Sequence, residues 1–361
     1  MTATTITAEA KPGMMAKLET IGDVLDRLIT IDLKGRGAVD ILYREARRRA
    51  GKPLTMRAAC EIRSHVQRGS AAVLCTGFPV RPWISPAIGE TDGPPGVAAL
   101  ARAISTGLCA VPLVTAPAGM REQVVAALRG GGVLVVDPDA AKRAAEGSRP
   151  TCAAAVIDFP TDRNEAAGAA ERIMATYQPS LIASLEHPGA NREGIYHSSV
   201  GLDVSEGTAK VEALFALAAS HGVLTMSLID MPNEIGAAAI ADVAEQASIF
   251  ARKCACPCKG GTLGASDVDV LVVGTTVNWA AYATVAALSI LLGDPNILAT
   301  QEHDRRAMEA MQLAGSLEGV SGYVWPATGV DGIPTSWSAH IVELVREVAK
   351  DAIFTQSRSP F

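Results

Sequence analysis

Short apolar runs alternate with amphipathic helical segments along most of the chain. Three stretches with a helical period come first, at Leu18–Ile29, Ala38–Ala50 and Arg57–Arg68. Short apolar runs then predict seven strands: Ala72–Thr76, Ala110–Thr115, Val133–Asp137, Ala154–Asp158, Leu181–Leu185, Val223–Ile229 and Val268–Gly274. Further helices are predicted between them at Pro95–Ser105, Arg121–Leu128, Asp139–Glu146, Asn164–Thr176, Thr208–His221 and Glu234–Ala251. This alternation predicts a three-layer α/β fold, a mostly parallel sheet with helices on both faces.

The composition narrows the class of partner. Hydrophobic residues make up 48% of the 361 positions and charged residues 19%, which excludes an intrinsically disordered chain. The formal net charge of −6 disfavours nucleic acid and an anionic membrane surface, so a small-molecule substrate is expected. The apolar run Ala280–Leu292 is too short to cross a membrane and predicts a buried helix.

The N-terminal segment shows no sign of a secretion signal or transit peptide, so a cytoplasmic location is expected. Residues 1–14 are small and polar and predict a flexible tail. Residues 15–361 predict a single domain, with N-terminal helices in 15–70 and the sheet region in 71–361. The sequence leaves the oligomeric state open, with a homo-oligomer among the options.

Polar residues collect in the loops after the predicted strands, where parallel sheets bind their ligands. Glu90, Asp92 and Gly93 belong to a Gly- and Pro-rich loop that leads into a helix. Such a loop can hold an anion at the helix N-terminus, or it can be a turn in which Asp92 caps the helix. The fingerprints of dinucleotide-binding and phosphate-binding loops are absent from the sequence.

Two later loops carry more carboxylates. Glu186 and His187 follow the fifth strand in a Pro-Gly turn, and Asp230, Asn233 and Glu234 follow the sixth. Acid–base chemistry is one interpretation of these groups. The alternatives are a structural histidine at position 187 and a favourable helix-dipole contact at position 234.

The loop after the last strand adds an amide and an aromatic ring. Asn278 is either a ligand contact or a helix N-cap, and Trp279 is either a ligand contact or a core residue. Because the carboxyl ends of parallel strands meet at one edge, we expect one pocket lined by these residues: Glu90, Asp92, Glu186, Asp230, Asn233, Glu234 and Asn278.

The seven cysteines are an odd number in a chain without a secretion signal, so structural disulfides are not expected. Cys254, Cys256 and Cys258 are candidate metal ligands, because thiolates bind zinc and iron–sulfur clusters. Their spacing is unusual, and no fourth Cys or His lies within a few residues. Alternate residues of a strand also point to opposite faces. Free thiols or a weak metal site are therefore expected.

Several short stretches form a recognisable pattern: Thr76-Gly77-Phe78-Pro79, Glu90-Thr91-Asp92-Gly93-Pro94-Pro95-Gly96, Glu186-His187-Pro188-Gly189, Gly201-Leu202-Asp203-Val204, Asn233-Glu234-Ile235-Gly236, Val277-Asn278-Trp279 and Val330-Asp331-Gly332. In order and spacing, from about residue 20 to 345, the chain resembles the D-glutamate cyclase C-terminal domain family. This domain also ends the mitochondrial D-glutamate cyclase of animals.

The resemblance implies an enzyme that closes an acyclic amino acid into a lactam with loss of water, or opens the ring. In the named enzyme the reaction is D-glutamate to 5-oxo-D-proline. Lactam closure needs a base for the amine, hydrogen-bond donors for the oxyanion and an acid for the departing hydroxide. Carboxylates, asparagines and backbone N–H groups are the types of group that do this.

The chain departs from the family pattern in two loops. The family usually has Glu-Arg-Pro-Gly at Glu186–Gly189 and Gly-Asp-Gly-Gly-Asn-Glu at Ile229–Glu234. The first change removes an arginine that could bind a substrate carboxylate, and the second narrows a loop. The substrate is therefore either D-glutamate or a related ring compound.

These observations assign provisional roles. Catalytic residues are predicted to be Glu234, Glu186, Asp92 and His187, and substrate contacts to be Glu90, Gly93, Asp230, Asn233, Asn278 and Trp279. Glu234, in the first turn of a helix, is expected to keep a low pKa when exposed and to act as the base. Glu186 is the better candidate for the protonated partner if the pocket is apolar. The cofactor is unknown, and a divalent metal such as Mn²⁺ is one option. Alternatives are a metal-dependent lyase or hydratase and a non-catalytic binding protein.

Overall fold

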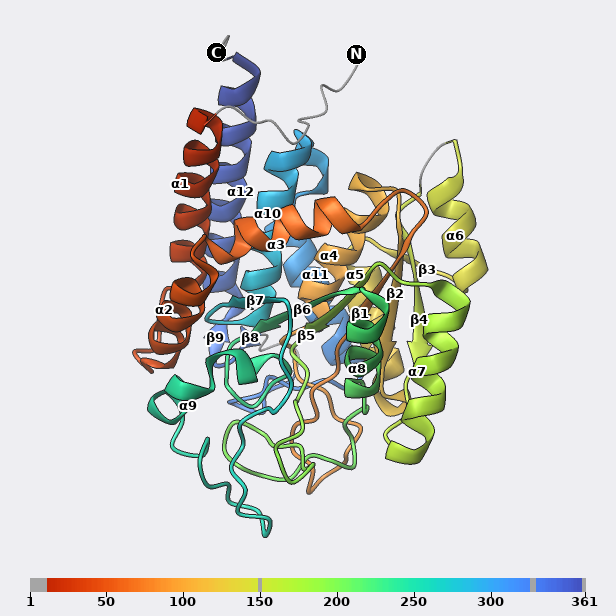
Figure 1. The fold of residues 1–361 in the computed structure, drawn as a ribbon, viewed down its shortest axis with the longest axis vertical. Coiled ribbons are helices and arrows are strands. Elements are labelled where there is room, and N and C mark those ends of the chain that lie inside the picture. Colours follow the sequence, from red (N-terminus) through yellow and green to blue (C-terminus); the bar gives the residue numbers. More distant parts are fainter. Residues whose placement is uncertain (1–11, 149–150, 325–328, 359–361) are drawn as a thin grey trace.

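The computed structural model describes residues 12–148, 151–324 and 329–358. Within these residues, seven strands form one parallel sheet in the order β3-β4-β2-β1-β5-β6-β7 (Figure 1). Their bounds are β1 Ala71–Cys75, β2 Val111–Ala116, β3 Leu134–Val135, β4 Ala153–Asp158, β5 Leu181–Leu185, β6 Leu224–Ile229 and β7 Val270–Val273. Each overlaps one of the predicted strands, so the predicted sheet is confirmed.

Helices cover both faces of the sheet. In β1, Ala72 and Leu74 join the larger apolar core, whereas Val73 and Cys75 join a smaller core on the opposite face. The larger core includes residues of α3 (Leu54–His65), α4 (Pro94–Gly107) and α10 (Val277–Leu292). The smaller includes residues of α6 (Pro138–Glu146), α7 (Arg163–Tyr177) and α8 (Glu212–His221). This confirms the three-layer α/β fold.

The predicted apolar helix, α10, is buried from Val277 to Leu291 and packs against α3, α4 and a helix near the C-terminus. That helix, α12, runs beside α1 (Figure 1). The remaining elements are α1 Pro12–Ile29, α2 Ala38–Ala50, α5 Arg121–Gly130, α9 Ala241–Ala247, α11 Gln301–Leu313, α12 Thr335–Arg358, a β8–β9 hairpin (Gly329–Val330 and Ile333–Pro334) and 3-10 turns at Ala118–Met120, Ala237–Ile240 and Pro295–Ile297. None of the described helices is long and apolar enough to span a membrane.

Several predicted boundaries are wrong. The helix predicted at Arg57–Arg68 is α3, at Leu54–His65. Of the predicted tail, residues 1–14, positions 1–11 lie outside the described residues. The other three positions are helical, because α1 begins at Pro12, and proline is favoured in the first turn of a helix. The helix predicted from Thr208 begins at Glu212. The helix predicted over 234–251 is only a 3-10 turn from Ala237 followed by α9, because Gly236 has φ 93° and cannot be part of a right-handed helix.

The strand order locates a switch point. β1 lies beside both β2 and β5, and the chain leaves β1 toward α4 on one face but leaves β5 toward α8 on the other. A crevice opens between two such strands at their carboxyl ends, where α/β proteins bind ligands. In Figure 1 the long loops after β1, β5 and β6 gather at this end of the sheet.

Candidate functional site

A pocket of about 480 Å³ lies at this switch point. The loops after β1, β5 and β6 form much of its wall. The other lining residues are Arg36, Ala38, Ala247, Gly319, Val320 and Asp331. Four of the predicted site residues are among its lining: Glu90, Glu186, Asp230 and Asn233. The structure therefore brings side chains from three predicted loops to one cavity.

Six carboxyl groups gather here, and we call them the acidic cluster: Glu90, Asp92, Glu186, Asp230, Glu234 and Asp331. One oxygen each of Asp92, Asp230 and Asp331 lie within 4.8 Å of one another. The same holds for Glu186, Asp230 and Glu234. Asp230 belongs to both groups and joins them.

Burial and mutual repulsion oppose charge in the acidic cluster. Burial raises the pKa of Glu186 well above its ordinary value, and the neighbouring Glu234 and Asp230 raise it further. The pKa values of Glu90, Asp92 and Asp230 are likewise raised, first by burial and then by Asp331. Like charges in a low-dielectric site cannot all ionise at neutral pH. The site must therefore either hold protons or gain a positive charge.

Two arginines line the same pocket. Arg36 donates to the backbone carbonyl of Asp331 at 2.8 Å. Arg81 donates to the carbonyls of Gly319 and Val320, at 2.9 and 3.2 Å. A guanidinium has five N–H donors, so each arginine keeps donors that can bind an anion in the pocket.

Asp92 is held at the N-terminus of α10. Its carboxylate accepts N–H bonds from Val277 at 2.7 Å, Asn278 at 2.8 Å and Gly93 at 3.0 Å. The alternative that Asp92 caps the helix near Pro95 is therefore wrong. Asp92 caps α10 instead, because two of its three N–H donors belong to that helix. The interaction ties the loop after β1 to the loop after β7.

Asn278 makes the reciprocal contact. Its side-chain oxygen accepts from the backbone N–H groups of Gly93 and Gly96, at 3.1 and 2.8 Å, and its amide donates to the carbonyl of Thr91 at 3.0 Å. Asn278 thus caps α4, while the N-cap of α10 itself is Thr276. Three of the hydrogen-bonding positions of this amide are occupied within the protein.

Glu186 directly follows β5 with a left-handed backbone, φ 48°. A Cβ at Gly93 would lie 2.6 Å from the Cβ of Glu186, which explains the glycine there. Gly93 is thus a packing position beneath Glu186. The Oε2 atom of Glu186 is buried and has no hydrogen-bond partner among the described residues. One carboxyl oxygen is therefore free to exchange a proton in the pocket.

Glu234 lies in the loop between β6 and α9. Its Oε1 accepts N–H bonds from Asp230 and Met231, both at 3.0 Å, and its Oε2 has no partner among the described residues. Burial raises its pKa to about 8, although these two N–H groups oppose the shift. The placement of Glu234 in the first turn of a helix is wrong, because the next element is a 3-10 turn that begins at Ala237. The low pKa expected for an exposed side chain does not apply, since Glu234 is buried.

Six predicted site residues are not among the described residues that line the pocket: Asp92, Gly93, His187, Glu234, Asn278 and Trp279. His187 and Trp279 are both fully buried. The ring of His187 contacts the carbonyl of Pro188 through Nδ1 at 2.9 Å, and burial lowers its pKa to about 4. The ring is therefore neutral at physiological pH. Trp279 donates from Nε1 to Ser338 at 2.9 Å and belongs to the apolar core.

Comparison with known proteins agrees with this geometry. The family model described as D-glutamate cyclase-like, C-terminal, matches residues 25–346. The chain belongs to this family. The match spans the pocket and confirms the resemblance drawn from the short sequence stretches. A search of the curated proteins finds no match.

Within the region matched to the D-glutamate cyclase-like family, Asp331 is a site residue that sequence reasoning missed. It connects β8 to β9 with φ 50°, lines the pocket and belongs to the acidic cluster. The stretch Val330-Asp331-Gly332 is one of those that carry the family resemblance, and this could have indicated a role for Asp331 in the site. Asn233, which was predicted, donates to the carbonyl of His197 at 3.0 Å, and its side-chain oxygen has no partner among the described residues.

The three clustered cysteines lie in the loop between α9 and β7, beside the pocket. All seven cysteines are free, as predicted. The expectation that alternate side chains would point apart is wrong, because the segment is a turn and not a strand, and the sulfur atoms of Cys254, Cys256 and Cys258 converge. His197, 59 residues before Cys256, joins them.

Proposed function

We propose that the protein closes or hydrolytically opens a small cyclic amide that carries a carboxylate, as a cyclase of the lyase class or as a cyclic-amide hydrolase. The reference reaction is the conversion of D-glutamate to 5-oxo-D-proline and water. The family match supports an enzyme of this kind. The observation that carries the proposal is the pair formed by Glu186 and Glu234. Their carboxyl oxygens lie within 4.8 Å of each other, their pKa values are raised, and Glu186 lines a pocket that two arginines also line.

In ring closure the amine forms a C–N bond to the side-chain carboxyl carbon, and a C–O bond breaks. A base must take the amine proton, and an acid must protonate the departing oxygen so that water leaves. We assign the base to Glu234 and the acid to Glu186. Ring opening uses the same groups in the reverse direction.

The surroundings of the two carboxyls favour this assignment. Two backbone N–H groups stabilise the anion of Glu234. The pKa of Glu186 is raised by burial and by four neighbouring carboxylates. The proton shared by such a pair therefore resides mainly on Glu186. Two carboxyls with different proton affinities are what acid–base catalysis at one site requires.

Substrate orientation is assigned to the pocket wall. Arg81 and Arg36 would bind the substrate carboxylate, taking the place of the arginine usual in the family at position 187. The free side-chain oxygen of Asn233 would accept an N–H of the amine or amide.

A divalent cation fits the acidic cluster, because its donors are hard carboxylate oxygens of the type that Mn²⁺ and Mg²⁺ prefer. Asp92, Asp230 and Asp331 would hold it, since their oxygens already converge within 4.8 Å. When bound, the cation would polarise the reacting carbonyl and offset the repulsion between the carboxylates.

The test is proton NMR of the protein with D-glutamate, 5-oxo-D-proline and a set of cyclic ureides, each with Mn²⁺ and with a chelator. Interconversion of a ring with its open form supports the proposal. Elimination or addition of water without ring chemistry would favour a metal-dependent lyase or hydratase. Saturable binding without turnover in any arm would favour a binding protein.

A further inference from the structure

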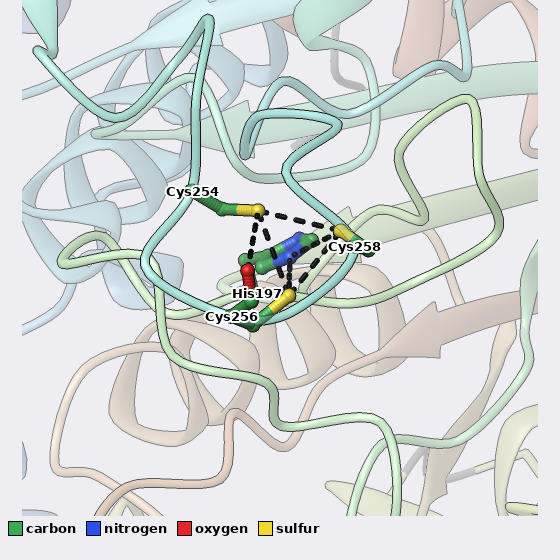
Figure 2. Close-up of side chains that lie close together, drawn as sticks. All are labelled: His197, Cys254, Cys256 and Cys258. Atoms are coloured by element: carbon green, nitrogen blue, oxygen red, sulfur yellow. Dashed lines mark hydrogen bonds between the residues drawn. The ribbon is translucent and has the colours of Figure 1, made fainter.

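A second group of ligating side chains lies beside the pocket, outside the acidic cluster. Cys254, Cys256 and Cys258 belong to the loop between α9 and β7, and His197 belongs to the loop after β5 (Figure 2). Each offers one ligand atom, and all four atoms lie within 4.8 Å of one another. We call these four residues the thiol cluster.

The distances fit one tetrahedral ion. The Sγ atoms lie 3.2, 3.3 and 3.5 Å apart, and Nε2 of His197 lies 3.2 Å from the Sγ of Cys256 and 3.5 Å from that of Cys258. A tetrahedral zinc site with Zn–S bonds of about 2.3 Å and a Zn–N bond of about 2.0 Å has edges of about 3.8 Å between sulfurs and about 3.5 Å between sulfur and nitrogen. The thiolates are too close together to surround an iron–sulfur core, so a single ion is the better fit.

The loop around the cysteines is built to converge. Lys259 has φ 55° and its N–H donates to the carbonyl of Cys256 at 3.4 Å, which turns the chain back. The N–H of Gly260 and the side-chain amide of Asn191 point to the Sγ of Cys258, at 3.4 and 3.7 Å. Such N–H groups stabilise thiolate ligands from outside the coordination shell.

Burial and charge also agree with a metal. His197 is fully buried, and Cys254 and Cys256 are 3% and 8% exposed. Three thiolates with one divalent ion and a neutral imidazole carry a net charge of −1. The basic residues Arg252, Lys253 and Lys259 flank the cluster in sequence, and the ammonium of Lys259 donates to the carbonyl of Ala255 within the cysteine loop at 3.1 Å. Four protein ligands leave no open position, which is typical of a structural zinc site.

The thiol cluster is connected to the pocket wall. The N–H groups of Ala255 and Cys256 donate to the carbonyl of Gly201, at 3.0 and 3.1 Å. Ser198, Val200 and the neighbouring Ser199 and Leu202 line the pocket immediately after His197. A link between the two loops therefore fixes one wall of the pocket.

We propose that His197, Cys254, Cys256 and Cys258 bind one zinc ion that holds the loop after β5 against the loop before β7 and so fixes the pocket wall at residues 198–202. The proposal goes beyond the proposed function and does not depend on it. Zinc content and cobalt spectra report on the thiol cluster whether or not the protein turns over a substrate.

The first test is elemental analysis of the full chain, purified under reducing conditions without added metal and then titrated with zinc. About one tightly bound zinc per chain is expected. Cys256→Ser and His197→Ala should each weaken zinc binding by about 100-fold or more, and the exposed control Cys60→Ser should leave it unchanged. Absence of tight binding in the wild-type chain, or equal binding in all variants, would overturn the proposal.

The second test uses the wild-type chain alone, so it does not depend on a variant folding. After chelation, Co²⁺ should give thiolate-to-metal charge-transfer and tetrahedral d–d absorption that zinc displaces, whereas a cation on the acidic cluster gives no thiolate band. Hydrogen exchange at residues 198–202 and 254–264 should accelerate when zinc is removed. An octahedral cobalt spectrum would contradict the assigned role. So would hydrogen-exchange rates at both loops that are the same with and without zinc.

Discussion

At Glu234, two backbone N–H groups favour the anion while burial opposes it, and the balance gives a pKa of about 8. Glu234→Gln keeps the shape of the side chain and removes the proton acceptor. Turnover should fall by roughly 100-fold or more, the scale of a lost general base. Stability at neutral pH should change little, because a carboxyl with a pKa of about 8 is mostly uncharged there and the Gln oxygen can still accept from Asp230 and Met231. Steady-state kinetics and denaturant unfolding check both outcomes, with Glu171→Gln at an exposed position of α7 as the matched control.

The same pKa sets a pH dependence. A base must be deprotonated, so kcat/KM without added cation should rise with pH up to about 8, and it should fall again at higher pH where Glu186, the acid, loses its proton. A cation on the neighbouring carboxylates favours the anion, so Mn²⁺ should move this midpoint to lower pH. In Glu234→Gln the rising limb should disappear. A profile that is the same in the variant would assign the ionisation to another group.

Individual site residues were predictable where a loop followed a buried strand. Glu90, Glu186 and Asp230 could be assigned to one pocket because parallel strands end at a common edge. Asp331 could not, since it lies between two-residue strands with no apolar run to mark them. Trp279 was predicted as a substrate contact but belongs to the apolar core. Its place in the sequence, directly after a strand, fits either location.

Between elements, the paired contacts of Asp92 and Asn278 join the N-termini of α4 and α10. Asn278→Ala would leave the N–H groups of Gly93 and Gly96 and the carbonyl of Thr91 without this partner. The free energy of unfolding should fall by about 2–4 kcal/mol, since unsatisfied buried groups are costly. The exposed control Asn164→Ala should change it by less than about 0.5 kcal/mol. Equal unfolding midpoints in urea for the two variants would show that the contact does not stabilise the fold.

Helix prediction succeeded in part: α11 and α12 were not predicted, and some predicted helices had the wrong extent. α10 was predictable because a long apolar run between turn signals fits a buried helix. The predicted helix over 234–251 was too long. Gly236 has a positive φ, which keeps the helix from starting before Ala237, and the sequence pattern does not show this backbone conformation. The N–H groups of Asp230 and Met231, in the loop after β6, instead donate to the carboxyl of Glu234.

For the whole molecule, the acidic cluster couples stability to pH. A carboxyl such as Glu234 ionises near 4.5 when unfolded but near 8 when folded, so between these values the folded state binds more protons than the unfolded state. Stability from this group is therefore full below about 4.5 and falls as pH rises toward 8. Calorimetry should show Tm falling over this range in chelator, with Mn²⁺ reversing the loss. A Tm insensitive to both pH and Mn²⁺ would contradict the electrostatic account of the pocket.

The layered architecture was predictable from the alternation of apolar runs and helices, because each strand must be covered on both faces. The thiol cluster was not, because His197 approaches Cys256 across 59 residues through the folding of two irregular loops. Long-range contacts between loops have no periodic pattern in the sequence. They follow only once the sheet has fixed where the loops begin.

The most direct test of the central claim is mass spectrometry of the substrate set after incubation with the protein and Mn²⁺ in H₂¹⁸O. We predict that one cyclic amide opens to a product with ¹⁸O in its new carboxylate, and that Glu234→Gln slows this by roughly 100-fold or more. Incorporation of ¹⁸O as a hydroxyl on a carbon chain, neither opening nor closure of any ring by the folded wild-type chain, or an equal rate in the variant would contradict the claim that this pocket performs acid–base chemistry on a cyclic amide.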